Sequence, residues 1–160
     1  MKSYAGIGSR ETPVDVQQQM AAIASRLSRQ NYILYSGGAG GADTAFERGS
    51  AQKIIFLPWD NFNGRKVDGV VYVRPPVNFD LVKQYHPNFL ALSYGAKALM
   101  SRNSYQVLGP DLQSPVEFVL CWTKDGKMIG GTSQALRIAK SKNIPVFNFY
   151  HGYQEFANYM

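Results

Sequence analysis

The chain has 160 residues and a formal net charge of +6, with 17 Lys and Arg against 11 Asp and Glu. This length predicts one domain, residues 1–160, with its own hydrophobic core. The single cysteine, Cys121, excludes a disulfide framework and a cysteine-rich zinc module. No apolar run reaches the roughly 18 residues of a membrane span, and the N-terminus lacks a signal-peptide pattern. We therefore expect a cytoplasmic protein with no membrane partner.

Charged residues are scarce and aromatic residues are numerous. The charged fraction is 18%, below the roughly 25% of ordinary globular domains, and the aromatic fraction is 13%. The positive charge therefore comes from a shortage of acids. This composition favours an anionic or aromatic partner, such as a nucleotide or nucleic acid. The alternative is that the rings fill the core and the ordinary surface.

The N-terminal part alternates strands and helices. Residues 4–8 predict a short apolar strand that ends in glycine, and Thr12 is expected to cap the helix that follows. That helix is predicted over residues 13–30, because its apolar side chains recur at spacings of three and four. Residues 32–35 predict a second buried strand, followed by a glycine-rich loop and a short helix, and residues 53–58 predict a third strand.

The second part returns to the same alternation after an irregular stretch. Residues 59–87 lose clear periodicity and predict an insertion or lid, in which residues 70–73 are a candidate short strand. The remaining predicted elements are a helix over residues 88–101, a strand over 116–122, a helix over 130–142 and a strand over 144–148. The alternation predicts an α/β fold with a parallel sheet and helices on both faces.

Three of the predicted strand–helix junctions carry glycine: residues 6–10, 36–43 and 130–132. In an open parallel sheet, ligands bind beyond the carboxyl ends of the strands. Glycine lets the backbone approach a ligand closely, and the N-terminus of the following helix favours an anion. The three turns together predict a phosphate site, although glycine at a single junction also has a purely geometric interpretation.

Two familiar nucleotide motifs are absent from these turns. No Gly-Lys-Ser/Thr follows the spacing of a P-loop, and the nearest lysine to the second turn, Lys53, lies beyond its helix. The first turn has Glu11 where the dinucleotide fingerprint has its third glycine. ATP hydrolysis and ordinary NAD-dependent hydride transfer are therefore not expected.

The turns resemble those of the SLOG superfamily, which joins the DNA-processing protein A (DprA/Smf) family to the Lonely-guy (LOG) phosphoribohydrolases. Residues 6–10 look like the glycine-Ser-Arg turn of the DprA family, residues 36–45 like its Ser-Gly-Gly-Ala-x-Gly-x-Asp loop, and residues 102–103 like its Arg-Asn pair. The Gly-Gly-Thr at residues 130–132 is shared more widely, including by LOG proteins and small stand-alone phage members. The resemblance implies a Rossmann-like fold that binds nucleotide-type ligands or single-stranded DNA.

The resemblance to LOG enzymes breaks at their catalytic glutamate, whose position falls on Ala135. No carboxylate lies in the predicted helix after residues 130–132. Asp43 is the best remaining acid, and it is interpreted either as a helix cap or as an acceptor for ligand hydroxyls. His86 and His151 lack a nearby metal-ligand companion, and Cys121 lies in an apolar strand. We therefore expect no catalytic residue, no metal, no cofactor and, on balance, no enzyme.

The predicted site combines backbone turns with two arginines. Arg10 and Arg102 are expected to bind phosphate, because a guanidinium can donate two parallel hydrogen bonds to it. Trp59 and Trp122 are candidates for base stacking, with core packing as the alternative. The predicted ligand-binding residues are Gly8, Ser9, Arg10, Ser36, Gly37, Gly38, Ala39, Gly40, Gly41, Asp43, Arg102, Asn103, Gly130, Gly131 and Thr132.

The favoured function is binding of a phosphate-bearing nucleotide ligand, an ADP-ribose derivative or a cyclic oligonucleotide. Such a protein would act as a sensor or, in a phage, as a sponge that sequesters a host immune signal. The alternatives are single-stranded DNA binding as a recombination mediator, for which Lys124, Lys127, Arg137, Lys140 and Lys142 are candidates for a basic stripe, and a LOG-like phosphoribohydrolase. The aromatic C-terminal residues 147–159 predict a homo-oligomer.

Overall fold

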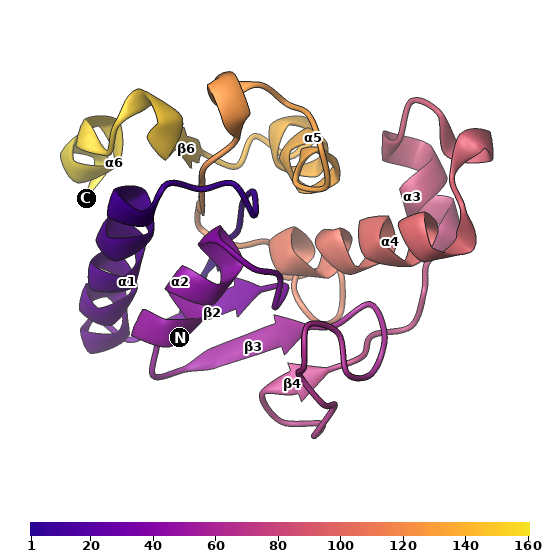
Figure 1. The fold of residues 1–160 in the computed structure, drawn as a ribbon, viewed down its shortest axis with the longest axis horizontal. Helices are drawn as coiled ribbons and strands as arrows, with labels where there is room; N and C mark the ends of the chain where they lie inside the picture. The colour runs from indigo at the N-terminus through magenta and orange to yellow at the C-terminus, as the bar shows by residue number, and fades with distance from the viewer.

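The computed structural model describes residues 1–160 and has a six-stranded, all-parallel sheet at its centre (Figure 1). In chain order the strands are β1 (Lys2–Gly6), β2 (Tyr32–Ser36), β3 (Lys53–Phe56), β4 (Tyr72–Val73), β5 (Val119–Cys121) and β6 (Val146–Asn148). Their order across the sheet is β4-β3-β2-β1-β5-β6. The predicted α/β, Rossmann-like fold is confirmed, although β5 and β6 are shorter than the apolar runs that predicted them.

Helices cover both faces of the sheet. The first face packs against α1 (Val14–Arg29), α2 (Ala42–Gly49) and α6 (Gln154–Tyr159). The second packs against α3 (Phe79–Tyr85), α4 (Tyr94–Leu108) and α5 (Ser133–Ser141). Short 3-10 turns lie at Phe89–Ala91, Lys124–Gly126 and Phe149–His151. None of the helices is long and apolar enough to cross a membrane.

The central strand β1 shows why the sheet is buried on both sides. Tyr4 belongs to the core cluster on the first face and the next residue, Ala5, to the cluster on the second. Successive side chains of a strand point to opposite faces, so both must be apolar when helices cover both. The Tyr4 ring stacks on Phe118 at a centroid distance of 5.8 Å, and burial raises the pKa of its hydroxyl.

The predicted cap of the first helix is wrong. The Thr12 hydroxyl donates a hydrogen bond of 2.6 Å to the Ser9 carbonyl, and Pro13 takes the N-cap position without a side-chain cap. The hydroxyl is used to close the turn after β1, so the helix begins at Val14 without it. Thr12 therefore stabilises the shape of the first glycine turn.

The helix predicted over residues 88–101 lies further along the chain. It begins at Tyr94, where the Ser93 hydroxyl caps it by accepting a hydrogen bond of 3.1 Å from the Ala96 N–H. It ends at Leu108 because Gly109 adopts a φ of +83°, outside the helical region. This shift places residues 102–106 inside a buried helix.

Residues 59–87 contain more regular structure than predicted. The candidate strand is confirmed as β4, which pairs with β3 and extends the sheet by one strand. Helix α3 was not predicted because its seven residues are too short to display a helical period. It begins where the Asn78 side chain accepts a hydrogen bond of 3.0 Å from the Leu81 N–H.

The C-terminal aromatic side chains pack within the molecule. Phe156 lies 5.2 Å from Phe118 and 5.4 Å from Phe147, measured between ring centroids. Tyr150 and Tyr153 stay half exposed. Much of this segment therefore completes the first face of the sheet, and the homo-oligomer stays a prediction.

Candidate functional site

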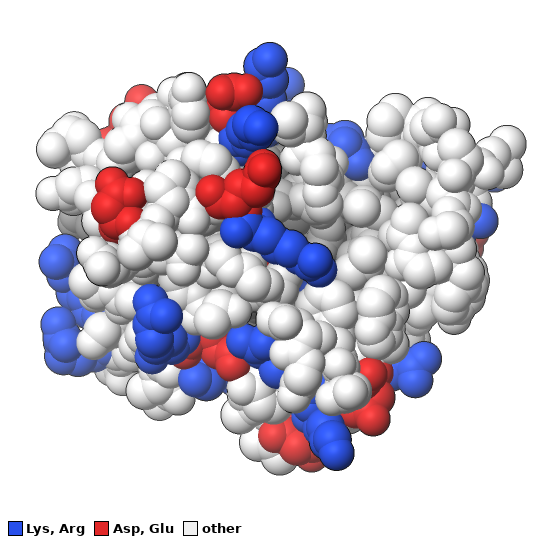
Figure 2. All heavy atoms as spheres, in the orientation of Figure 1, with Lys and Arg blue, Asp and Glu red and all other residues white.

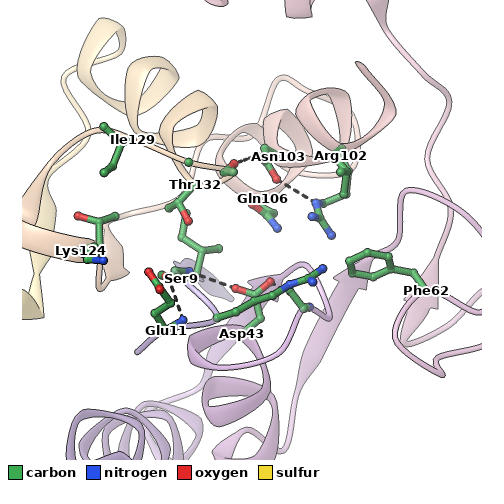
Figure 3. A pocket seen from close by; sticks show the side chains of 18 residues that line it. Ser9, Glu11, Asp43, Phe62, Arg102, Asn103, Gln106, Lys124, Ile129 and Thr132 are labelled. Atoms are coloured by element: carbon green, nitrogen blue, oxygen red, sulfur yellow. Dashed lines mark hydrogen bonds between the residues drawn. The ribbon is translucent and has the colours of Figure 1, made fainter. Parts of the chain in front are cut away.

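The three glycine turns follow β1, β2 and β5, which are neighbours in the sheet. Their strands are parallel, so the turns meet at the same edge. A cavity of about 420 Å³ opens there, with the first two turns on one side and α4 together with the third turn on the other (Figure 3). Its position is the one that the sequence predicted for a ligand site.

The cavity lining includes most of the predicted site residues. Those that line it are Gly8, Ser9, Arg10, Ala39, Asp43, Arg102, Asn103, Gly130, Gly131 and Thr132. The remaining residues of the second turn, Ser36, Gly37, Gly38, Gly40 and Gly41, are not part of the lining. Lys124, a candidate of the basic stripe, also lines the cavity, and the lining residues that the sequence did not indicate are Ile7, Glu11, Phe62, Leu99, Gln106, Thr123 and Ile129.

Asp43 holds the first two turns together. Its Oδ1 accepts a hydrogen bond of 3.1 Å from the Gly8 N–H, and its Oδ2 accepts one of 3.2 Å from the Ala39 N–H. It does not cap its own helix, because the N-cap of α2 is Gly41, without a side-chain cap. The carboxyl is only 4% exposed, and burial raises its pKa to about 6. Its structural role is therefore to position the turns.

This raised pKa predicts a pH dependence of stability. A carboxyl with a pKa of about 6 when folded, against an ordinary value of 3.8, binds more protons in the folded state between these two values. Its contribution is therefore fully present below the lower value and is lost as pH rises through the upper one, by as much as about 3 kcal/mol. The free energy of unfolding, measured in urea across this range, should fall less in Asp43→Asn than in the wild type. Asp15→Asn, on the exposed start of α1, is the control and should keep the wild-type slope.

Arg102 and Asn103 join the second turn to the third. The Arg102 Nη1 donates to the carbonyls of Gly37 and, at 3.2 Å, Phe56, and its Nε donates to the Asn103 Oδ1 at 2.9 Å. Asn103 in turn donates from Nδ2 to the Gly131 carbonyl. The Arg-Asn pair is thus a buried polar bridge from β2 to the start of α5.

Three basic side chains of the cavity lining, Arg10, Arg102 and Lys124, outnumber its two acidic ones, Glu11 and Asp43. Burial lowers the pKa of Arg102 to about 10, Asp43 opposes this shift, and the positive charge of Arg10 adds to it. The two guanidinium groups therefore repel each other across the site. Lys124 adds a third, exposed positive side chain to the lining. An anion among these groups would offset the repulsion.

Backbone N–H groups add to this positive character. Those of Gly40, Gly41, Gly130, Gly131 and Thr132 form no hydrogen bond within the protein. The last three stand directly before α5, where the helix dipole adds partial positive charge. Of these residues, Gly130, Gly131 and Thr132 line the cavity, so the site offers backbone donors at the start of α5.

The second turn requires glycine at position 41. Its φ is +76°, and an added Cβ would lie 2.7 Å from the Arg10 Cα. Gly64 has the same φ of +76° with open space around it. Gly41→Ala is therefore expected to lower the free energy of unfolding by about 2 kcal/mol more than Gly64→Ala, because only the first adds a steric clash to the backbone strain. Urea denaturation of both variants measures this difference, and equal losses would contradict it.

Residues 59–73 brace the second turn from outside. The Arg65 Nε and the Tyr72 hydroxyl donate to the two carboxylate oxygens of Glu47 on α2, at 2.8 and 2.6 Å. The Asn63 amide donates a hydrogen bond of 3.1 Å to the Gly38 carbonyl. The insertion therefore fixes a wall of the site, and nothing in these contacts assigns it a lid motion.

The two tryptophans lie outside the cavity. Trp122 is only 8% exposed and packs in the core, because its side chain points to the first face of the sheet. Trp59 is 40% exposed and meets the ring of Phe62 edge-on at 5.4 Å. Phe62 itself lines the cavity, and the Arg102 guanidinium carbon lies 5.3 Å from its ring centroid. Phe62 is therefore the aromatic ring of the site.

Apart from Asp43, the residues considered for catalysis do not line the cavity. Ala135 is fully buried on α5, and Cys121 is fully buried in β5, where burial raises the pKa of its thiol to about 12. No three His, Cys, Asp or Glu side chains gather to hold a metal ion. Of the candidate basic stripe, Lys124 lines the cavity, whereas Arg137 donates to the Tyr85 carbonyl at 2.8 Å. Figure 2 shows one face of the molecule, on which basic side chains are dispersed with acidic ones among them.

Comparisons with known proteins show a similar fold in a solved structure. Neither a protein-family model nor a curated protein matches the chain. The structure of DNA processing protein A from Helicobacter pylori is similar, with a TM-score of 0.61 and 16% sequence identity. The match covers 98% of this chain and 73% of that one. That structure was described for its single-stranded DNA binding mode. The likeness supports the DNA-processing protein A-like fold that the glycine turns predicted.

Proposed function

We propose that this protein binds single-stranded DNA and holds a backbone phosphate at the three glycine turns. The observation that carries the proposal is the convergence of these turns and two arginines on one cavity. The similar fold of a protein described for single-stranded DNA binding supports the polymer as the ligand. The Lys and Arg side chains are dispersed, so the affinity is expected to depend on this local site.

The phosphate would lie where donors surround it. Arg10 is exposed at the cavity and can donate two parallel hydrogen bonds to phosphate oxygens. Residues 130–132, whose N–H groups are unpaired, line the same cavity at the start of α5. Arg102 is fixed by its own hydrogen bonds, so it contributes mainly its charge.

A cluster of aromatic side chains offers a surface for bases beyond the cavity. Phe79 and Tyr94 lie 6.0 Å apart between ring centroids and are 40% and 65% exposed. The Lys97 ammonium lies 4.5 Å from the Phe89 ring centroid. Leu99, on the same helix as Tyr94 and about 8 Å further along it, lines the cavity. A single strand can therefore run from the phosphate site along α4 to stacking rings.

Fluorescence anisotropy with labelled oligothymidylate tests the proposal. We expect binding at low salt that weakens steeply as salt is added, because phosphate contacts release counterions. Unlabelled single strands should compete better than a duplex of the same length. Absence of binding at low salt would reject the proposal.

The Tyr94→Ala variant distinguishes binding of the DNA strand from binding of a single phosphate group. It should weaken oligothymidylate binding about tenfold, because stacking on one ring is lost. Binding of thymidine monophosphate, measured by calorimetry, should not change. Tyr153→Ala removes a ring that is 45% exposed at the start of α6 and is expected to leave both affinities at the wild-type level. A loss for both ligands would place Tyr94 at the phosphate site instead.

A free nucleotide ligand is the second candidate, and the cavity favours it. Its volume of about 420 Å³ lies in the range of small-molecule sites. An ADP-ribose derivative or a cyclic oligonucleotide would place its phosphates at the same turns, and the protein would act as a sensor or a sponge. Calorimetry against these compounds distinguishes the candidates, because a sponge must bind one of them more tightly than oligothymidylate.

A further inference from the structure

Gln106 is a buried amide at the cavity that no protein group satisfies. It lies one turn after Arg102 on α4, is only 2% exposed, and lines the cavity. Neither its Oε1 nor its Nε2 forms a hydrogen bond within the protein. Every side-chain nitrogen or oxygen that is fully enclosed does have a partner, so these two amide atoms are not fully enclosed. The amide atoms must therefore keep their remaining access through the cavity.

Another buried glutamine shows the usual arrangement. Gln134 on α5 is fully buried, and its Oε1 accepts a hydrogen bond of 2.8 Å from Arg137, while its Nε2 donates to the Val82 carbonyl at 3.4 Å. A buried amide without such partners is costly, because it loses water and gains nothing in exchange. The exception at Gln106 therefore points to a partner that enters the cavity.

The surroundings hold the amide in place for such a partner. An added Cβ at Gly37 would collide with the Gln106 Nε2 and lie 2.7 Å from the Arg102 Nη1, so the second turn leaves room for both side chains. Figure 3 shows Gln106 pointing from α4 into the space between Arg102 and Asp43. These groups together present donors and acceptors at the inner end of the cavity.

We propose that Gln106 recognises the edge of a nucleobase at the inner end of the cavity, while the phosphate stays at the glycine turns. This inference rests on the proposed function. Phosphate oxygens only accept hydrogen bonds at neutral pH, so they cannot satisfy the amide oxygen. A base edge presents a donor beside an acceptor, which a planar amide can pair with twice. The buried carboxylate of Asp43 and guanidinium of Arg102 flank the same position.

Binding of single-base homopolymers tests this assignment. The probes are labelled oligoadenylate, oligocytidylate and oligothymidylate of equal length, together with an abasic strand that keeps the sugar-phosphate backbone. The wild type is expected to favour one base about tenfold over the others. Gln106→Leu should reduce that preference to about twofold without changing abasic binding. Gln113→Leu, on an exposed loop, is the control and should keep the wild-type preference.

A second variant keeps the test decisive if leucine disturbs the fold. Gln106→Glu preserves the shape but can only accept hydrogen bonds, so it should shift the preference away from thymine and toward cytosine and adenine, which present amino groups. An unchanged preference in both variants, or equal losses for abasic and base-bearing strands, would overturn the assignment. Equal binding of every strand by the wild type would overturn it while leaving DNA binding intact. Binding of none would reject the proposed function itself.

Discussion

Arg102→Met is expected to lower the free energy of unfolding by about 4 kcal/mol and to abolish ligand binding. The side chain is 6% exposed and donates to the carbonyls of Gly37 and Phe56 and to the side chain of Asn103. Methionine fills much of the space but leaves these acceptors without a donor. The loss therefore affects both the core and the bridge between the second and third turns.

Asp43 increases the cost of this substitution. The charge of Arg102 is the largest influence that opposes the rise in the pKa of Asp43, whose carboxyl is buried. Without that charge the carboxylate has less compensation, so its pKa should rise further and more of it should be protonated at neutral pH. The Asp43 hydrogen bonds to Gly8 and Ala39 would weaken as the charge disappears.

Urea denaturation with matched variants measures these effects. Arg48→Met removes the same charge from an exposed position on α2 and is expected to change stability by no more than about 0.5 kcal/mol. Arg102→Lys keeps a charge but cannot reach all three acceptors, so it should fall between the wild type and Arg102→Met. A loss in Arg102→Met no greater than that in Arg48→Met would contradict the bridging role.

The position of the site was predictable because parallel topology brings distant turns together. The three glycine junctions lie far apart in the sequence, but β1, β2 and β5 are adjacent and all end at the same edge. Alternating elements are enough to predict that edge, whereas they do not specify which junctions are neighbours. The structure supplies that order, and the order explains why Asp43 reaches Gly8 instead of capping its own helix.

The inner part of the cavity could not be predicted from local patterns. Gln106 lies beyond residue 101, where the predicted helix ended, so its place one turn after Arg102 was not visible. Phe62 belongs to a stretch without periodicity, and only the folded structure shows that it packs beside Arg102 and lines the cavity. Trp122 follows an apolar strand, and the face it occupies depends on the register of β5. Each of these features depends on contacts between segments that are distant in sequence.

Arg10→Gln is expected to weaken oligothymidylate binding about 50-fold at low salt while leaving stability unchanged. The residue is exposed and forms no side-chain hydrogen bond within the protein, so its removal disturbs no packing. Its charge lowers the pKa of Arg102, which places the two guanidinium groups in the same electrostatic field. A phosphate bound there would lose its bidentate partner and one neutralising charge.

The salt dependence of binding distinguishes this role from a general effect of charge. Arg29→Gln removes the same charge at the last residue of α1, on the opposite edge of the sheet from the glycine turns (Figure 1). Arg10→Gln should reduce the magnitude of the slope of log affinity against log salt by about 1, the contribution of one phosphate contact. Arg29→Gln should keep the wild-type slope. Equal losses and equal slopes in the two variants would mean that the DNA responds to net charge alone. A loss confined to Arg10→Gln would instead locate the phosphate beside the first glycine turn, because Arg10 is the exposed arginine of the cavity lining.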